Sequence, residues 1–467
     1  MSGLRLGTSD GRWALAATVL GSGVVLLDTT VVNVALPTVG RDLGASFADL
    51  QWTVNGFALS LAALLLLGGS LGDRYGRRRV FVVGTVWFGV ASVLCGLAPT
   101  VELLVAARVL QGVGGALLVP GSLAILQSSF DAQDRGRAIG LWSALGALAA
   151  ALGPFLGGLL VEVSWRLVFL VNVPLCAVVV VVAVRRVPET RDPDSAPHLD
   201  VAGALLGAAG LAALTYGLVA LGDDTAGGPV AAALVAGVAL LAAFVVVEHR
   251  SPGPMVPLGL FSSRQFTATN VVTLLVYAAL AAVLLLVVVH LQVVGGFSPL
   301  ASGLALVPVT ACMLLLSSRS GAVAARVGPR WPMTAGPLLC AAGTVLLARV
   351  PEGASYLVDV LPGVLLFGLG LATVVAPLTV TVLAAAPERH AGVASGVNNA
   401  VARTAGLLAV AVLPAVSGLT GADYQDPAQF APGYRTALLL SAGLLAAGGL
   451  LSAVAVSDRE VRARQRS

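Results

Sequence analysis

Lysine is absent from this sequence, histidine and cysteine occur four times each, and charged residues make up only 11% of the 467 residues. A soluble globular protein carries about 25% charged residues, and no polar stretch here is long enough to fold by itself. A soluble domain is therefore excluded. Because 57% of the residues are hydrophobic, the composition predicts an all-α polytopic membrane protein.

The scarce reactive residues do not group into a site. The cysteines lie scattered inside apolar segments, which excludes a disulfide framework or a metal site. The cysteines are Cys95, Cys176, Cys312 and Cys340, and the histidines are His198, His249, His290 and His390. Since the histidines are also scattered, we expect no enzyme activity, no metal and no cofactor.

The positive net charge of +4 does not indicate a nucleic-acid partner. The arginines lie in short connections between apolar segments, where membrane topology explains them better. The absence of lysine, with an excess of alanine, glycine and valine, suggests a bacterial source.

A membrane-crossing helix needs about 20 mostly apolar residues, and fourteen segments meet this need. They are 13–37, 50–71, 80–98, 102–127, 138–162, 167–184, 200–221, 229–248, 266–291, 302–324, 333–349, 357–383, 392–418 and 434–456. An even number of transmembrane helices puts both termini on one side. With the N-terminus inside, the inner connections and tails hold 20 of the 27 arginines and the outer connections hold 4. This bias predicts cytoplasmic N- and C-termini in the cytoplasmic membrane of a bacterium.

An internal repeat divides the chain. Residues 69–78 align without gaps on residues 321–330, and Gly136 and Gly140 have looser counterparts in Gly392 and Gly396. The similar spacings predict two six-helix halves, 1–190 and 251–467, with two inserted transmembrane helices in 191–250.

One carboxylate lies where carboxylates are rare. Asp28 is the only charge in the apolar run from Trp13 to Leu36, and burying a charge there costs roughly 2.5–3.5 kcal/mol. Arg108, inside the fourth segment, lies about 9 Å from its outer end, and Asp28 lies about 13 Å from the outer end of the first. We predict that Asp28 is the proton-coupling carboxylate or a substrate contact, with Arg108 as its partner. A purely structural buried pair is the alternative.

Other polar residues inside the segments are candidates for a substrate cavity. They are Asn33, Asn55, Gln111, Asn398, Asn399 and Arg403. For the two N-terminal asparagines, hydrogen bonding between helices is an equal alternative. Glu102, Glu162 and His290 lie near outer helix ends, where an interfacial role competes with proton transfer.

Two glycine-containing segments are candidates for the conformational switch. The loop after the second segment contributes Gly69, Gly72, Asp73, Arg74, Gly76, Arg77 and Arg78, and the fifth segment contributes Gly146, Gly153, Pro154, Gly157 and Gly158. The glycines permit close helix packing, which we expect against a span of the other half, and the proline permits a bend. Asp73 is predicted to contact the N-terminal end of the thirteenth segment near Ala391. Ala325 stands at the corresponding position of the second half, which should lack this contact.

These motifs resemble a known family. The loop 69–79 is similar to that of the major facilitator superfamily. Residues 27–37, 108–115 and 146–158 resemble the first-, fourth- and fifth-helix motifs of its fourteen-helix drug:proton antiporters. Gln51-Trp52 and the segment Trp165–Pro174 also fit. The resemblance implies that the fifth helix seals the state that is open to the cytoplasm.

The function that fits best is proton-coupled secondary export of hydrophobic drugs or antibiotics by alternating access. Its partners would be a small hydrophobic or amphiphilic substrate, protons and the lipid bilayer, and we expect a monomer. An exporter of a lipid or other amphiphile, or a solute importer, is the alternative because a fold does not fix a function. A channel would need a filter or a charged ring, and neither pattern occurs.

Overall fold

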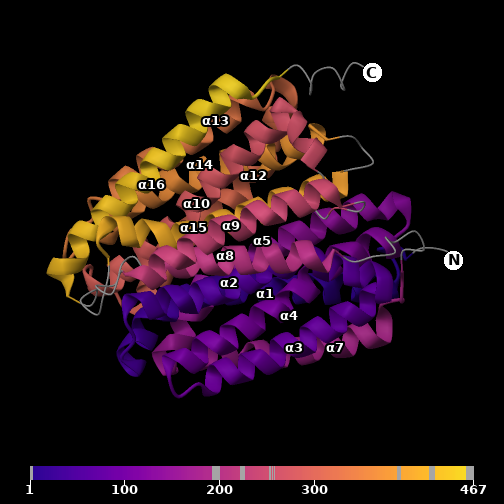
Figure 1. Cartoon of the computed structure of the whole chain (residues 1–467), viewed down its shortest axis with the longest axis horizontal. Helices are drawn as coiled ribbons and strands as arrows, with labels where there is room; N and C mark the ends of the chain where they lie inside the picture. Colours follow the sequence, from indigo (N-terminus) through magenta and orange to yellow (C-terminus); the bar gives the residue numbers. More distant parts are fainter. Residues whose placement is uncertain are drawn as a thin grey trace. The chain divides into compact units, whose positions relative to one another are not determined.

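The regular elements of the computed structural model are helices (Figure 1). The structure describes residues 4–191, 200–220, 227–251, 254, 256, 258–386, 391–419 and 426–458. Within these ranges, strand pairing is limited to one isolated bridge between Leu4 and Phe130. The expected all-α class is therefore confirmed.

The helices before residue 200 are α1 (Ser9–Leu43), α2 (Phe47–Tyr75), α3 (Arg77–Leu97), α4 (Val101–Ser129), α5 (Ala132–Val163), α6 (Leu167–Leu170) and α7 (Asn172–Arg186). Two further helices follow, α8 (Val201–Ala220) and α9 (Gly228–Arg250). The remaining elements are η1 (Leu258–Ser262), α10 (Arg264–Val293), α11 (Pro299–Ala305), α12 (Val307–Val327), α13 (Arg330–Leu347), η2 (Tyr356–Val360), α14 (Leu361–Ala384), α15 (Ala391–Ser417) and α16 (Pro427–Ala455).

Each of the fourteen predicted segments overlaps a helix, but fewer helices have the length and apolarity of a membrane span. Among the described residues, eleven helices qualify, or twelve if the bent α2 counts as one span. The helix α13 falls short because its 18 residues begin with Arg330, Trp331 and Pro332, which lower its mean hydropathy. In α5, only Leu152–Val163 stands out as an apolar helix, and it is too short. The chain is a multi-pass membrane protein, while the number fourteen and the side of the termini remain predictions.

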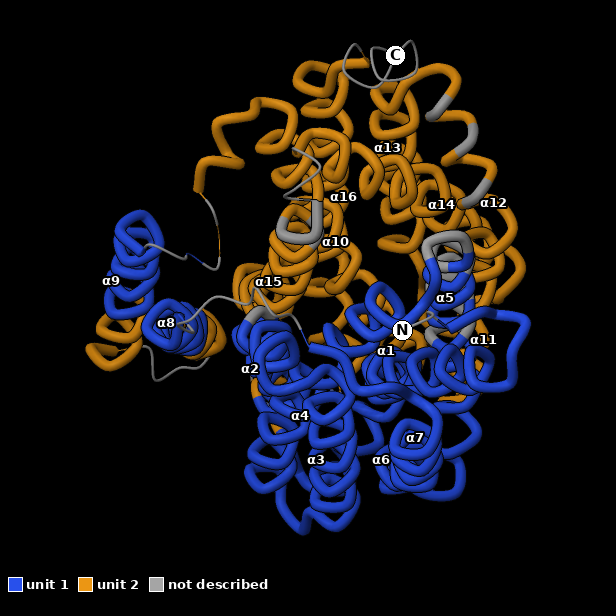
Figure 2. The backbone as a smooth tube through the Cα atoms, turned by 90° about the vertical axis from the view of Figure 1, so that its right-hand side faces the viewer, with its two compact units in different colours: residues 1–45, 49–214, 235–255 blue, residues 46–48, 215–234, 256–467 orange. Residues whose placement is uncertain are grey.

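The chain forms two compact units, shown in different colours in Figure 2. Unit 1 comprises residues 1–45, 49–214 and 235–255, and unit 2 comprises residues 46–48, 215–234 and 256–467. In unit 1, α1 packs on α4, α5 and α7, and α3 packs on α4 and α7. In unit 2, α10 packs on α15 and α16, α13 packs on α14 and α16, and α12 packs on α14.

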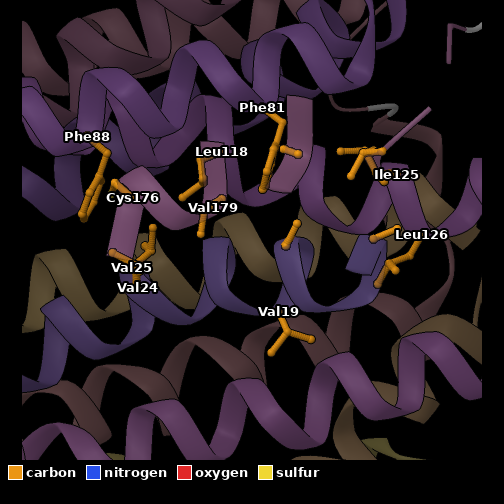
Figure 3. Packing of buried hydrophobic residues seen from close by; sticks show 14 of the residues in the cluster. Val19, Val24, Val25, Phe81, Phe88, Leu118, Ile125, Leu126, Cys176 and Val179 are labelled. Atoms are coloured by element: carbon orange, nitrogen blue, oxygen red, sulfur yellow. The ribbon is translucent and has the colours of Figure 1, made fainter. Parts of the chain in front are cut away.

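The core of unit 1 lies between α1, α3, α4 and α7 (Figure 3). Val25, Phe81, Leu118 and Val179 contribute to it from these four helices and are at most 1% exposed. Glycine lets α3 and α4 approach closely, because a Cβ on Gly114 would lie 2.6 Å from the backbone nitrogen of Phe88. Such close contact favours association of helices in a membrane, where burial of apolar surface contributes little.

Candidate functional site

Asp28 lies on α1, a helix with a capped N-terminus and paired polar side chains. The Thr8 side chain caps α1 by accepting the Gly11 N–H at 3.1 Å. Farther along, the hydroxyls of Thr18 and Ser22 donate to carbonyls of the preceding turn, so these polar groups are paired inside the apolar run. Asp28 follows on the same helix and is 1% exposed. The chain therefore places a carboxylate inside unit 1, away from lipid.

Arg108 of α4 reaches Asp28 directly. Its Nη1 donates to Asp28 Oδ2 at 2.5 Å and to Gln111 Oε1 at 2.6 Å, and its Nε donates to the Thr53 carbonyl of α2 at 3.0 Å. The guanidinium also lies 4.3 Å from the ring centre of Phe57, which is cation–π distance. The arginine thus has several uncharged partners in addition to the carboxylate.

The second carboxylate oxygen is bound by two amides. Gln111 Nε2 and Asn172 Nδ2 each donate to Asp28 Oδ1 at 2.9 Å. Ser92 of α3 accepts from the same two amides, at 2.9 Å from Gln111 and 3.4 Å from Asn172. We call Asp28, Ser92, Arg108, Gln111 and Asn172 the buried polar cluster. It joins α1, α3, α4 and α7.

The buried polar cluster has a definite electrostatic character. Its one carboxylate and one guanidinium compensate each other, and every member is at most 1% exposed. Breaking a buried pair by removing one partner typically costs about 3–5 kcal/mol. Burial favours the protonated carboxyl group, whereas a nearby cation favours the carboxylate. The two charges therefore depend on each other as long as both stay buried.

One acceptor in the cluster is unpaired. Asn172 Oδ1 is buried and has no hydrogen-bond partner within the part of the chain that the structure describes. Leaving a buried acceptor unpaired costs about 1–3 kcal/mol.

The structure brings together some of the residues chosen from the sequence and leaves others apart. Asp28 and Arg108 are paired, as their similar depth predicted. Gln111, expected in a substrate cavity, donates a hydrogen bond to Asp28. Asn55 is 0% exposed, and neither atom of its amide has a partner in the described ranges, nor has Asn33 Oδ1. These two asparagines thus have unused hydrogen-bonding capacity.

The candidates of unit 2 form a separate group. Asn398 of α15 donates to Asn270 Oδ1 at 3.1 Å and to Thr273 Oγ1 at 2.7 Å, both on α10. Arg403, five residues farther along α15, interacts electrostatically with Tyr277 of the same partner helix. Asn399 is exposed. Polar side chains of α10 and α15 therefore face one another.

The polar groups near predicted outer ends differ in burial. Glu102 and Glu162 are exposed. His290 is 2% exposed, stacks on Tyr434 with 3.7 Å between ring centres, and lies 2.9 Å through Nε2 from the Val350 carbonyl. This environment is structural in character. No group of three His, Cys, Asp or Glu side chains suited to a metal occurs among the residues described.

The loop after α2 is held by an acidic residue that sequence reasoning missed. Glu189 Oε1 accepts the backbone N–H of Arg78 at 3.1 Å, and Glu189 Oε2 lies 3.7 Å from Arg79 Nε. Gly76 has φ +114°, and a Cβ there would collide with the Glu189 carboxylate. A carboxylate at the start of α3 also complements the positive end of the helix dipole. We call this arrangement the first carboxylate clasp.

Unit 2 contains the same arrangement. Asp458 Oδ1 accepts the backbone N–H of Arg330 at 3.1 Å, at the start of α13. Gly328 has φ +99°, and a Cβ there would collide with the Asp458 carboxylate. We call this the second carboxylate clasp. The two glycines and the two arginines are the pairs that the sequence repeat aligned.

The other residues of the loop lie around the first clasp. Asp73 forms an ion pair with Arg77 at 2.8 Å, and Arg74 lies over the ring of Tyr75. A Cβ on Gly69 would be in ordinary contact with Pro120, and one on Gly72 with the Arg77 backbone. The predicted contact of Asp73 with the helix start near Ala391 stays untested, since residues 387–390 lie outside the described ranges.

Three of the four glycines chosen in α5 face α1 of the same unit. A Cβ on Gly153 would collide with the Thr30 side chain, one on Gly157 would lie 3.1 Å from the Val31 backbone, and one on Gly146 would lie 3.4 Å from Leu26. The reason is helical periodicity, which places these three glycines on one face of α5. Gly158 is also buried, and Pro154 is half-buried. The tight α1–α5 contact therefore lies within three residues of Asp28.

Comparison with known proteins is consistent with this architecture. The sequence profile of the Major Facilitator Superfamily matches residues 18–410. The chain is similar to the puromycin resistance protein pur8 of Streptomyces alboniger, with 37% identity over 96% of this chain and 92% of that protein. The tetracenomycin C resistance and export protein of Streptomyces glaucescens is 37% identical over 85% of this chain and 74% of its own length. The methylenomycin A resistance protein of Bacillus subtilis is 32% identical over 89% of this chain and 90% of its own length.

Solved structures show the same fold at low identity. A bacterial homologue of the human lysosomal transporter Spinster superimposes with a TM-score of 0.72 at 15% identity, covering 98% of each chain. A peptide transporter of the POT type also gives 0.72 at 15% identity, covering 99% of this chain and 97% of that one.

Proposed function

Since this chain belongs to the Major Facilitator Superfamily, a family of transporters and not of enzymes, we propose that it is a proton-coupled exporter of hydrophobic drugs or antibiotics. It acts in the cytoplasmic membrane of a bacterium. The relatives support this substrate class, because several are named for resistance to, or export of, an antibiotic. The pur8 match, which covers nearly all of both chains, supports the same function for the whole length.

The observation that carries the proposal is the pairing of Asp28 with Arg108 at 2.5 Å inside unit 1. A carboxylate that is enclosed and neutralised by one arginine exchanges a proton only when that pairing or the enclosure changes. Such a group is suited to couple proton binding to a change of conformation. It is less suited to permanent contact with a substrate, since its oxygens are already occupied by protein donors.

The surroundings of Arg108 support reversible protonation. When Asp28 is neutral, the guanidinium keeps Gln111 Oε1, the Thr53 carbonyl and the face of Phe57 as electron-rich partners. These contacts hold the cation in place while the carboxyl group is protonated. The buried polar cluster then changes its charge while Arg108 stays in place.

Transport proceeds by alternating access in this proposal. Two six-helix halves, residues 1–190 and 251–467, rock about a central site, and the two helices of 191–250 are an insertion between them. Asn33 and Asn55, with amide atoms that are buried and unpaired in the described structure, are the substrate contacts that we assign to the first half. Asn398, Asn399 and Arg403 are those that we assign to the second.

The loop 69–79 and the α1–α5 contact form the conformational switch. The first carboxylate clasp fixes the start of α3, so Asp73 is held where it can meet a second surface during the cycle. The glycines of α5 hold α1 against α5 close to Asp28, so a movement of α5 would be passed to the carboxylate.

Reconstituted protein in lipid vesicles tests the proposal. An imposed proton gradient should drive accumulation of a hydrophobic drug such as puromycin, and an uncoupler should abolish it. Asp28→Asn should lose proton-driven transport, whereas Asp10→Asn, at the exposed carboxylate of the same helix, should retain it. Proton-driven efflux that survives Asp28→Asn would reject the coupling role. Transport of lipid in place of drugs, or drug import, would select the alternative functions.

A further inference from the structure

The protonation of Asp28 has a defined site within the buried polar cluster. Oδ2 is bound to the Arg108 guanidinium, and Oδ1 is bound only to the neutral amides of Gln111 and Asn172. A proton on Oδ2 would face the donating N–H of a cation. Oδ1 is therefore the oxygen that takes up the proton.

A protonated Oδ1 needs an acceptor where it now has donors. The ionised carboxylate only accepts, so both amides must present their NH₂ groups to it. A carboxylic acid donates one hydrogen bond, and an amide oxygen can accept it if the amide turns by half a rotation. One of the two amides must therefore turn when Asp28 is protonated.

Gln111 is not free to turn. Its Oε1 accepts a hydrogen bond from Arg108 Nη1 at 2.6 Å and lies 3.7 Å from Cys95 Sγ. Its Nε2 donates to Asp28 and to Ser92. A half rotation would place its NH₂ group against the guanidinium, which also has only donors. Gln111 therefore stays in one orientation in both states.

Asn172 is free to turn. Its Oδ1 has no partner to lose in the described structure, and its Nδ2 makes only the 2.9 Å bond to Asp28 and a long 3.4 Å contact to Ser92. The terminal amide torsion is broad and roughly two-fold, so a half rotation fits the same space. In either orientation one atom of the amide is unpaired. The proton on Asp28 therefore decides between the two orientations.

The remaining titratable or charged groups facing Asp28 do not compete for this role. They are Arg108 on α4, Cys95 on α3 and Cys176 on α7, and each of them interacts electrostatically with Asp28. From α2 the contact is the Thr53 carbonyl, which holds Arg108. Arg108 has only donors, and a thiol is a weak donor and a weak acceptor, so none of these groups replaces an amide that donates to the carboxylate and accepts from the acid.

We propose that Asn172 is the positioning residue of the proton site, an amide that donates to the Asp28 carboxylate and turns over to accept from the protonated acid. The proposal rests on the proposed function of Asp28. In the step, one proton from water adds to Oδ1, the cluster changes from neutral to a single positive charge, and no covalent bond breaks. Asn172 is the first residue of α7, so the half rotation of its amide links the protonation of Asp28 on α1 to α7.

Infrared difference spectroscopy on the full chain in lipid vesicles tests this proposal. The spectra compare acid and alkaline forms of protein that carries ¹³C in the asparagine side-chain carbonyl. We expect a carboxylic-acid band of Asp28 to appear at low pH together with a shift of one asparagine band to lower frequency, because a free carbonyl gains a hydrogen bond. Asp28→Asn should remove both changes.

Substitutions identify which asparagine gives the shifted infrared band. Asn172→Leu should remove it and lower proton-driven transport about tenfold, the effect of losing one hydrogen bond to a charged group. Asn270→Leu, which removes another buried asparagine, should leave the band in place. If Asn172→Leu does not fold, Asn172→Gln supplies a second variant, whose unlabelled glutamine carbonyl also removes the band.

The outcomes separate the two proposals. If the Asp28 band appears and no asparagine band moves, or the band survives loss of the Asn172 amide, the turnover is wrong and the role of Asp28 stands. If the Asp28 band is absent across the whole pH range while transport remains proton-driven, the role of Asp28 itself is overturned.

Discussion

Asp28 and Arg108 form an ion pair with 2.5 Å between Oδ2 and Nη1, and neither side chain is more than 1% exposed. The pair joins α1 to α4 within unit 1. Because both charges are out of water, each depends on the other and on the amides around them.

The dependence of the two charges predicts non-additive stability. Arg108→Gln leaves an uncompensated buried carboxylate and should lower the free energy of unfolding by about 3–5 kcal/mol. Adding Asp28→Asn removes the charge and should restore most of that loss. The unfolding temperatures of the two single variants and the double variant in detergent measure this coupling. Additive losses in the double variant would show that the pair is not coupled.

The α1–α5 contact predicts a strict size limit at one position. Gly153→Ala places a methyl group against the Thr30 side chain, and overpacking of this kind costs about 1–3 kcal/mol. We expect a lower unfolding temperature and slower drug efflux. Gly443→Ala on α16 is the matched control, since a Cβ there meets nothing within 4 Å. Wild-type stability and transport in Gly153→Ala would mean that α1 can move away without consequence.

The carboxylate clasps predict two independent local effects. Glu189→Ala removes the acceptor of the Arg78 N–H and should accelerate hydrogen exchange in residues 76–79. Asp458→Ala should do the same in residues 328–331 and leave 76–79 unchanged. Each variant is the control for the other. Mass-spectrometric hydrogen exchange measures both, and equal protection in variant and wild type would contradict the clasps.

Asp73, near the end of α2, predicts a variant that transports slowly but binds substrate normally. Asp73 is 38% exposed and pairs with Arg77, so Asp73→Asn should change stability by less than about 1 kcal/mol. If Asp73 closes the inner face by contacting a helix start, the same variant should transport slowly and bind substrate normally. Binding titrations and efflux rates on one preparation measure the two effects. Unchanged transport kinetics would exclude the contact.

Sequence reasoning succeeded where a charge stands out against an apolar background. Asp28 and Arg108 were found because ionised groups are costly inside a membrane, and their depth followed from the helical rise. The repeat was found because Gly76 and Arg78 have counterparts of the same type in Gly328 and Arg330.

The residues that were missed give weaker signals. Asn172 is an uncharged amide in a segment chosen only for its resemblance, and nothing local distinguishes it from an asparagine that joins two helices. Glu189 and Asp458 are different residue types in short polar tails, at a spacing that differs from that of the glycines they contact. Their common role is visible only when the fold brings each tail to its loop. The contact of the α5 glycines with α1 was also missed, because periodicity defines a face of a helix and does not name its neighbour.

The first carboxylate clasp has a consequence for changes in the segment that follows it. Glu189 and the Thr190 carbonyl, which accepts the Arg77 N–H at 3.0 Å, anchor the polypeptide between α7 and α8. The end of α7 is therefore attached to the start of α3 before the chain reaches α8. Changes in length after this anchor should leave the packing of α3 on α7 undisturbed.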